Sequence, residues 1–176
     1  MSKQKYPVTG KGRVSFPSVY EPDTFGDSAP KYKITLLFDP DDPCLEEIKE
    51  VVEKAVAEKW KVRPTFDPDH YPISDGDEKS YAGYAGKIAV KFSNRSQPKV
   101  VGGDKQFITR ESGMFYAGCY ARVSYSAYAY DNRKKGVLLT FYNVQKMGDG
   151  DPLGGGYSDP DDDFDLIEEE YDSLID

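Results

Sequence analysis

Residues 116–130 place aromatic rings, one cation and small hydroxyl groups at alternate positions. The odd-numbered residues are small or apolar, as the core-facing side of a β-strand requires. The even-numbered side could bind a nucleic-acid strand, because bases stack on tyrosine rings and a cation meets the neighbouring phosphate, each stack contributing roughly 1–3 kcal/mol. Half-buried strands also favour tyrosine for packing alone, so this segment leaves both interpretations open. The even-numbered residues are Tyr116, Gly118, Tyr120, Arg122, Ser124, Ser126, Tyr128 and Tyr130.

Basic and aromatic residues elsewhere in the chain favour the nucleic-acid interpretation. Lys31 and Lys33 flank an aromatic residue in one expected strand, and two tyrosines lie among glycines in a loop, where their rings could swing over a groove. Lysines interleaved with aromatic rings on a sheet are what a single-strand groove needs. The residues expected to bind DNA are Lys33, Tyr81, Tyr84, Lys87, Lys91, Tyr116, Tyr120, Arg122, Tyr128, Tyr130, Arg133, Lys134 and Lys135.

The residue types that carry catalysis or bind metals are not combined in a recognisable way. His70 has no serine or cysteine nucleophile in a recognisable motif, and two cysteines with one histidine cannot build a zinc site of the usual spacing. The glycine pairs and triplets lack the lysine of a phosphate-binding loop. We therefore expect a protein that is not an enzyme, with no metal site and no cofactor.

Charge is distributed very unevenly along the chain, whose net charge is −8. Of the 31 acidic residues, 12 lie in residues 149–176, which contain no Lys or Arg, so 19 acidic and 23 basic residues remain before them. A mildly basic body with a strongly acidic end is a pattern that indicates nucleic-acid binding, with the acidic block as an interaction tail. No apolar run reaches the ~20 residues of a membrane helix, so we expect no membrane contact.

The acidic end also contains apolar residues that a purely solubilising tail would not need. Three of them, Ile167, Tyr171 and Leu174, are spaced so that they could share one side of a short helix on a partner. A glycine-rich linker precedes this segment, which predicts a DNA-binding domain at 1–148 and a linker with an unstructured tail at 149–176. The residues expected to contact partner proteins are Phe164, Ile167, Tyr171, Leu174 and Ile175.

Apolar periodicity predicts several strands and one helix that would position these residues. Alternation predicts strands at 13–20, 31–38, 87–92, 115–130 and 137–146, the last two as a hairpin with a basic tip. A helix is expected over residues 43–60, capped by Asp42. Residues 63–86 are expected to form a long loop, and residues 94–104 a turn-rich connection. The fold class is therefore mainly β, an OB-fold-like, partly open barrel with one helix and a disordered acidic C-terminal tail.

Several motifs resemble a phage family of OB-fold single-stranded-DNA-binding proteins across residues 10–155. The most specific are Tyr116-Ala117-Gly118-Cys119-Tyr120 and Asn143-Val144-Gln145-Lys146. The resemblance implies coating of single strands in phage DNA replication, recombination and repair, in the cytoplasm of the infected bacterial host. It also implies a tail that recruits replication proteins (polymerase, helicase or primase). The chain departs from many such tails, which end in an aromatic or Pro-Phe tip, because it ends in Leu174-Ile175-Asp176.

Two other classes of protein remain as alternatives. A phage structural or interaction module would use the Tyr-rich face as a protein interface, where Tyr and Arg are also enriched. A metal-dependent nuclease would need a carboxylate cluster that the body lacks. The sequence leaves open whether the protein is a monomer or a homodimer.

Overall fold

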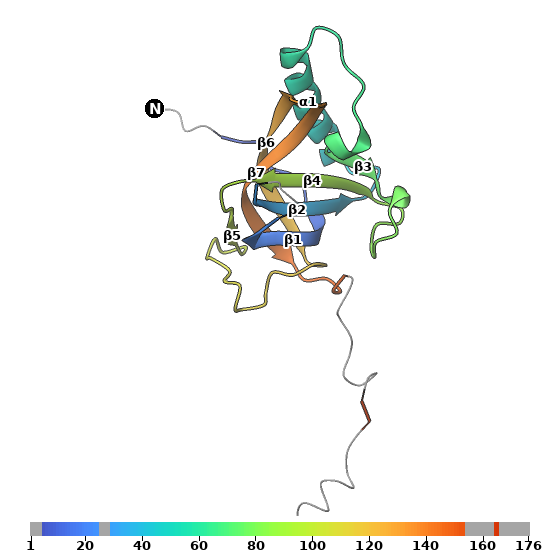
Figure 1. Cartoon of the computed structure of the whole chain (residues 1–176). Coiled ribbons are helices and arrows are strands. Elements are labelled where there is room, and N and C mark those ends of the chain that lie inside the picture. Colours follow the sequence, from blue (N-terminus) through green and yellow to red (C-terminus); the bar gives the residue numbers. More distant parts are fainter. Residues whose placement is uncertain (1–4, 25–28, 154–163, 166–176) are drawn as a thin grey trace, which may run out of the picture.

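The computed structural model describes residues 5–24, 29–153 and 164–165. Seven strands and one α-helix make up this part of the chain (Figure 1). The elements in order are β1 (Gly12–Asp23), β2 (Lys31–Phe38), α1 (Cys44–Lys59), the 3-10 turn η1 (Pro68–His70), β3 (Ile73–Asp75), the 3-10 turn η2 (Gly76–Glu78), β4 (Ile88–Asn94), β5 (Lys99–Val101), β6 (Tyr120–Asp131) and β7 (Lys135–Gly148).

Five of the strands form a partly closed ring in the order β4-β2-β1-β6-β7. Antiparallel pairing joins β2 to β1 and β4, and β6 to β7. The ring closes through short contacts: β4 pairs in parallel with β7 at Phe92 and Ser93, and β1 pairs with β6 at Gly12 and Arg13. This is a small, partly open barrel of the OB type, which confirms the predicted mainly β barrel with one helix; most of the tail predicted to be disordered lies outside the described residues.

Apolar side chains at alternate positions along the strands form the core, and the side chains between them point outward. Ile34 and Leu36 of β2 and Val90 and Phe92 of β4 are buried. On β6 the odd-numbered residues from Ala121 through Tyr125 are almost completely buried, and the even-numbered residues are partly or fully exposed. The predicted odd and even faces are therefore confirmed from Tyr120 through Tyr125; Ala127 and Ala129 are only half-buried, and residues 116–119 precede the strand.

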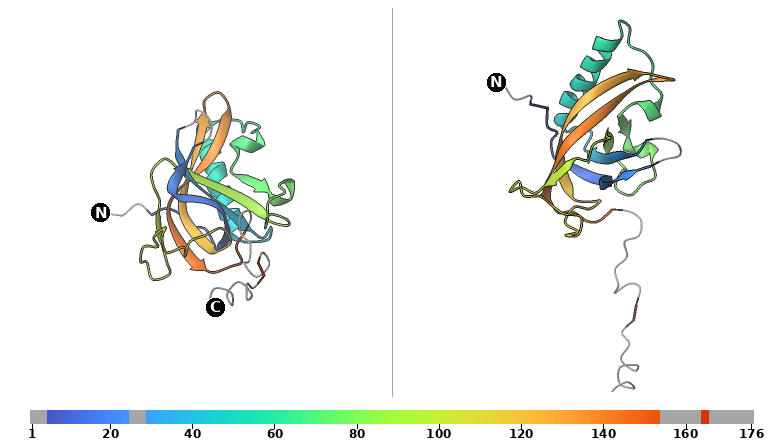
Figure 2. Two further views of the ribbon diagram at one scale, coloured as in Figure 1. Left: turned by 60° about the horizontal axis from the view of Figure 1, so that its bottom comes forward. Right: turned by 60° about the vertical axis from the view of Figure 1, so that its left-hand side comes forward.

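Helix α1 begins and packs as its sequence predicts. The carboxylate of Asp42 accepts a hydrogen bond from the backbone N–H of Cys44 (3.0 Å), which satisfies a donor at the helix N-terminus. Leu45, Ile48 and Val52 are buried on one side of the helix. That side contacts β6 and β7, so the hairpin rises past the ring along α1 (Figure 2). The helix therefore fixes where the hairpin stands relative to the barrel.

Besides shifts of one to three residues at element ends, three larger differences separate the prediction from the structure. The expected loop at 63–86 contains two 3-10 turns and β3, which pairs with β4. The expected connection at 94–104 contains β5, which pairs in parallel with β7. The strand expected from residue 115 begins at Tyr120. Both missed strands have three residues, and such short strands are specified by the neighbours they pair with rather than by a local pattern.

The residues that follow β7 lie against the barrel as far as Leu153. The backbone N–H of Leu153 donates to the carbonyl oxygen of Ala117 (2.9 Å), and the guanidinium of Arg13 donates to the carbonyl oxygen of Asp151 (2.7 Å). The side chain of Leu153 lies so close to Gly83 that a Cβ atom there would come within 2.8 Å of it. The φ of Gly83, +85°, also favours glycine. Residues 149–153 thus contact the body of the protein, although the sequence indicates a linker there.

Candidate nucleic-acid interface

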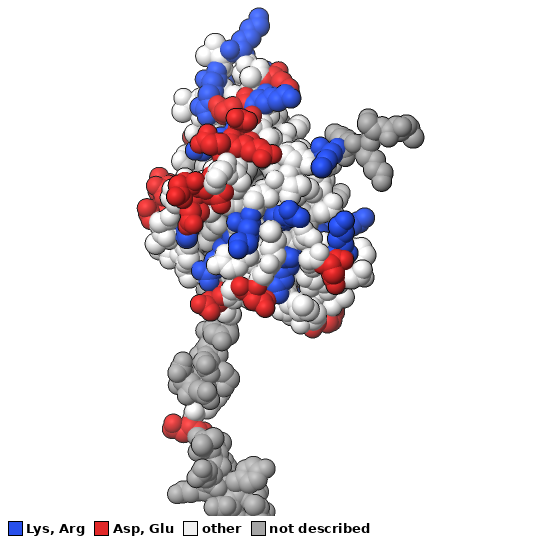
Figure 3. Space-filling model, turned by 180° about the vertical axis from the view of Figure 1, so that it is seen from behind, with Lys and Arg blue, Asp and Glu red and all other residues white. Residues whose placement is uncertain are grey.

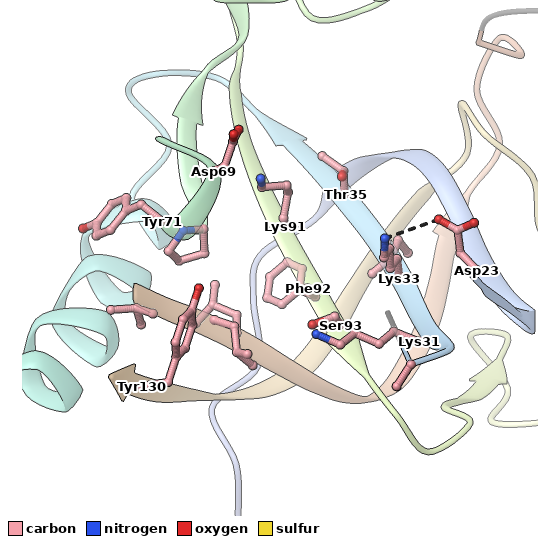
Figure 4. A pocket seen from close by; sticks show the side chains of 16 residues that line it. Asp23, Lys31, Lys33, Thr35, Asp69, Tyr71, Lys91, Phe92, Ser93 and Tyr130 are labelled. Carbon is pink, nitrogen blue, oxygen red and sulfur yellow. Dashed lines mark hydrogen bonds and ion pairs between the residues drawn. The ribbon is translucent and has the colours of Figure 1, made fainter. Parts of the chain in front are cut away.

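The outward sides of β2 and β4 carry three lysines that line a hollow together with residues of the hairpin. Because Ile34 and Phe92 point into the core, their neighbours point outward. The register places Lys33 opposite Ser93 and Thr35 opposite Lys91. Lys31, Lys33, Thr35, Lys91 and Ser93 form what we call the lysine face (Figure 4).

The lysine face opens onto two adjoining hollows that reach the hairpin. The first, of about 340 Å³, lies between the three lysines, Tyr71 and Tyr130. The second, of about 690 Å³, is lined by Lys31 again and by Arg95, Tyr128, Tyr130 and Tyr142. Since Lys31 and Tyr130 line both, the hollows are parts of one groove, which we call the barrel groove. It brings cations and aromatic rings together along an outer surface of the barrel.

The lysines of the groove are only partly compensated by acidic groups. Lys33 forms an exposed ion pair with Asp23 (3.3 Å), a kind of pair that contributes little to stability. Lys31 and Lys91 form no ion pair within the described residues. Burial of its ammonium group lowers the pKa of Lys91, and Asp69 opposes this shift. A phosphate entering the groove would therefore meet two ammonium groups, those of Lys31 and Lys91, that form no ion pair within the described residues.

Contacts with the segment around η1 hold the hairpin tip in place. Tyr130 and His70 share a hydrogen bond between the phenol oxygen and Nδ1 (2.7 Å), and Lys134 pairs with Asp67 (2.6 Å). The ring of Tyr130 lies over Gly136, where a Cβ atom would come within 2.3 Å of the phenol oxygen. Burial raises the pKa of Tyr130. The tip is thus fixed at the edge of the groove.

Two tyrosines predicted to bind DNA, Tyr116 and Tyr120, lie far from the groove. Eight residues separate Tyr120 from Tyr128, which is roughly 26 Å along a strand. The Tyr116 hydroxyl donates to the carbonyl oxygen of Gly150 (3.0 Å), and the Lys146 ammonium lies 5.4 Å from its ring centroid. Lys11 lies 5.3 Å from the ring centroid of Tyr120. These rings contact residues of their own chain, and the structure does not bring them together with the lysine face.

Arg122 also lies on a different part of the hairpin from the groove. Its Nε donates to the side-chain oxygen of Gln145 on β7 (2.8 Å). It lines a separate hollow together with Lys5, Tyr6 and Lys105. The predicted tyrosines and Arg122 that lie on β6 therefore share one side of the strand. They face different surfaces, however: Tyr128 and Tyr130 face the barrel groove, and Arg122 faces the separate hollow.

Tyr84 corrects the sequence prediction most clearly. Its ring was expected to swing over a groove, but the residue is 4% exposed and packs against Leu37 and Ala89. Its hydroxyl shares a hydrogen bond with Ser15 (2.9 Å), and burial raises its pKa. The ring is held in place by packing and cannot stack on a base. Tyr81, by contrast, is 52% exposed.

The remaining predicted cations occupy exposed positions. Lys87 precedes β4 and pairs with Asp39 outside the barrel groove. Arg133 and Lys135 are exposed at the hairpin tip. Seen from behind, one group of Lys and Arg lies over the lower middle of the body and another at its top, while Asp and Glu gather below that top group and on the left (Figure 3).

Four residues that carry a positive charge or a tyrosine ring into the groove are absent from the predicted set: Lys31, Tyr71, Arg95 and Tyr142. Tyr142 is an extra residue at an irregularity in β7, between the pairs of Ser124 and Tyr125, so simple alternation does not assign its side. Arg95 and Tyr71 lie outside the strands, and only the folded chain brings them to the groove. Lys31 carried a signal, because it is adjacent to Tyr32 in a clear strand.

The predicted tail contacts lie mostly outside the described residues. Phe164 is described and is 74% exposed. Ile167, Tyr171, Leu174 and Ile175 fall in the part that is not described. Within the described residues, no helix is long and apolar enough to cross a membrane, and no cluster of three metal-ligating side chains occurs.

An OB barrel whose outer face joins lysines to tyrosines has the architecture of a nucleic-acid-binding module. Residues 6–174 match the protein family described as Enterobacter phage Enc34, ssDNA-binding protein. The chain belongs to this family. The p50 protein of Acyrthosiphon pisum secondary endosymbiont phage 1 is 34% identical over 171 residues, which cover 90% of this chain and 93% of that protein.

The fold is also found in solved structures of phage single-stranded DNA-binding proteins. The single-stranded DNA-binding protein from bacteriophage Enc34 in complex with ssDNA has a TM-score of 0.70 at 21% identity, covering 84% of this chain and 88% of that one. The single-stranded DNA-binding protein gp2.5 of bacteriophage T7 has a TM-score of 0.63 at 18% identity, covering 92% and 95%. The OB-like barrel with its helix is therefore the fold that these phage proteins share.

Proposed function

We propose that this protein binds single-stranded DNA without sequence preference, with the strand lying in the barrel groove. The observation that carries the proposal is the groove itself, where Lys31 and Lys91 form no ion pair within the described chain. Lys31 lines the groove with Tyr128 and Tyr130, and Lys91 lines it with Tyr130. Phosphates would contact the lysines, and bases would stack on exposed rings. Membership of the family of the Enc34 protein supports the same assignment.

The groove suits chain-like ligands better than a small substrate. It is open along its length, and the cations lie on neighbouring strands rather than around one point. The described residues offer no cluster of ligands for a metal. We infer a role in binding rather than in catalysis, and the alternative of a purely structural module lacks an explanation for the lysines.

The acidic end would serve a second role in the same protein. With 12 acidic and no basic residues in 149–176, it would compete with DNA phosphates for the basic body. Its apolar residues would contact replication proteins such as a polymerase, helicase or primase. A phage protein of this kind would act in replication, recombination and repair in the cytoplasm of the infected host. We place the boundary of the domain after Leu153, because residues 149–153 contact the barrel.

Titration with oligo-dT at two salt concentrations tests the proposal, with quenching of the tyrosine and tryptophan fluorescence as the signal. Affinity should fall linearly on a log–log plot, with a slope of about −0.7 for each phosphate neutralised on a single strand. Several lysines predict several such contacts. No binding at low salt, or binding that does not respond to salt, would contradict the proposal and favour a protein interface.

A further inference from the structure

Two neighbouring aromatic side chains, Phe16 of β1 and Tyr81 before β4, are exposed to solvent outside the barrel groove. Phe16 is 58% exposed and Tyr81 is 52% exposed. Their ring centroids lie 4.9 Å apart with the planes at 76°. Single exposed apolar residues are ordinary, but rings that gather in one exposed patch commonly mark an interaction site.

The backbone at Phe16 is strained. Its φ is +45°, a region that residues with a side chain rarely occupy. The register between β1 and β2 shifts between Ser15 and Ser18, so Phe16 lies where the ladder is interrupted. Strained backbone persists only when the surrounding structure enforces it, and it concentrates at functional sites. This strained backbone holds a large apolar ring in solvent, an arrangement that does not stabilise the fold.

A small buried cluster supports the exposed pair. Tyr84 packs beneath it, with ring centroids 6.3 Å from Phe16 and 5.2 Å from Tyr81. The Tyr84 hydroxyl is tied to Ser15, and its ring contacts Leu37. The loop that carries Tyr81 is therefore anchored on the outer side of the sheet, and the two exposed rings have a fixed base.

The strand register puts this pair at the end of a row that crosses the lysine face. Ser15, next to Phe16, pairs with Thr35, and Thr35 pairs with Lys91. Lys91 precedes Phe92, which pairs with Leu139 on β7, and the neighbouring Leu138 pairs with Tyr128. These four steps follow the outside of the barrel from β1 round to β6, a path of roughly 19 Å along the backbones. Aromatic rings thus lie at both ends of this path, with Lys91 between them.

We propose that Phe16 and Tyr81 form a second base-stacking platform, on which a base of the single strand stacks after its backbone has crossed the lysine face. The proposal rests on the proposed function and adds the direction of the strand: across β1, β2, β4 and β7 toward Tyr128. The ligand is a nucleobase of single-stranded DNA, because the flanking lysines select a polyanion and an aromatic pair offers faces and edges for any base.

The test is oligo-dT titration of full-length variants in which only the rings change. Phe16→Ala and Tyr81→Ala should each weaken binding by roughly 5- to 150-fold, the equivalent of one lost stack. Phe16→Tyr keeps an aromatic ring and should bind with the parent affinity. Phe16→Leu should bind as weakly as Phe16→Ala, because leucine is apolar but has no ring. Phe107→Ala is the matched control: Phe107 is 71% exposed but lies beside β5, away from the lysine face.

A further variant separates binding from folding. Phe16→Gly removes the ring and suits the positive φ, so it should keep or raise the melting temperature and still bind as weakly as Phe16→Ala. If the parent binds oligo-dT and loses affinity on lysine substitution, but Phe16→Ala and Tyr81→Ala bind like the parent, the platform is overturned and the proposed function stands. Parent-like binding by Phe16→Leu would equally overturn stacking. A parent that does not bind at all overturns both.

Discussion

The two ends of the β6–β7 hairpin differ in what lies over their tyrosines. Tyr120, Tyr128 and Tyr130 lie on the same side of β6, and Tyr116 precedes the strand. At the far end, Tyr128 and Tyr130 open onto the lysine face. At the near end, the Tyr116 hydroxyl is bonded to Gly150, and Tyr120 contacts the position of the same glycine. Strand alternation decides which side faces outward, but contacts from elsewhere decide which part of that side is free for a ligand.

The difference has an energetic consequence for binding. A base that stacks on Tyr128, which is 59% exposed, displaces only water. A base at the other end would have to displace the chain's own residues and compete with the Lys146 ammonium for the Tyr116 ring. We therefore expect DNA to engage the Tyr128 end and to leave the Tyr116 end unchanged.

The largest effect is expected from reversing charges on the lysine face. The double variant Lys33→Glu, Lys91→Glu should weaken oligo-dT binding by more than about a hundredfold, because two phosphate contacts become repulsive. The slope of log affinity against log salt should become shallower by about 1.4 or more. Fluorescence titration over a salt series measures both.

The matched control for this charge reversal lies on helix α1. Lys49→Glu, Lys54→Glu changes the net charge equally at exposed positions away from the groove. It should affect affinity only through the long-range field, which salt screens. Equal losses in the two double variants would mean that overall charge, and not the lysine face, governs binding.

A smaller effect is expected from removing single rings at the two ends of the hairpin. Tyr128→Ala should weaken binding by roughly 1–3 kcal/mol, with little change in stability because the ring is largely exposed. Tyr120→Ala should change binding by less than about 0.5 kcal/mol, the range of substitutions away from a binding or core feature. Titration at one salt concentration suffices, and a larger loss for Tyr120→Ala would reverse the comparison.

Truncation should have a severalfold effect that depends on where the chain is cut. A chain ending at Leu153 loses most of the acidic residues and should bind DNA more tightly at low salt, with an unchanged melting temperature. A chain ending at Gly148 should bind as tightly but melt earlier, because it also loses the contacts of Asp151 and Leu153 with the barrel. For the chain ending at Gly148, the free energy of unfolding should fall by about 1–3 kcal/mol. Weaker binding after either cut would contradict competition by the acidic end.

The smallest effect on DNA binding is expected from the buried side of β6. The hydroxyl of Tyr125 is buried and has no hydrogen-bond partner within the described residues. Tyr125→Phe should raise stability by about 1 kcal/mol or more, since an unsatisfied buried group is costly, and leave affinity unchanged. Chemical denaturation and oligo-dT titration measure the two quantities, and a loss of affinity would show that this side of the strand is not merely core.

The pH dependence of stability gives a second readout for Tyr125. Burial raises its pKa above the ordinary value of 10.0, so the folded state keeps a proton that the unfolded state loses above that pH. Above about pH 10 the unfolded state is stabilised by ionisation of this tyrosine and the folded state is not. The free energy of unfolding therefore keeps its full value below about pH 10 and falls as pH rises toward the folded-state pKa. The Tyr125→Phe variant should lose less stability than the parent on this alkaline side.

Local pattern predicted the fold well because strands and helix follow from near-neighbour chemistry. The alternation in β2 and β6 and the cap at Asp42 are readable in short windows of sequence. The covering of Tyr84 and Tyr116 depends on residues far away in the chain, Ser15 and Gly150, and no window contains both partners. The same holds for Phe16, whose exposed ring looks in sequence like one more core residue of a strand.

Mapping amide chemical shifts during titration with oligo-dT shows directly which surface the DNA contacts. We expect the shifts to concentrate on the outward residues of β2 and β4 and on Tyr128 and Tyr130, with the amides around Tyr116 and Tyr120 nearly unmoved. Shifts concentrated around Tyr116 and Tyr120, with a silent lysine face, would contradict this expectation.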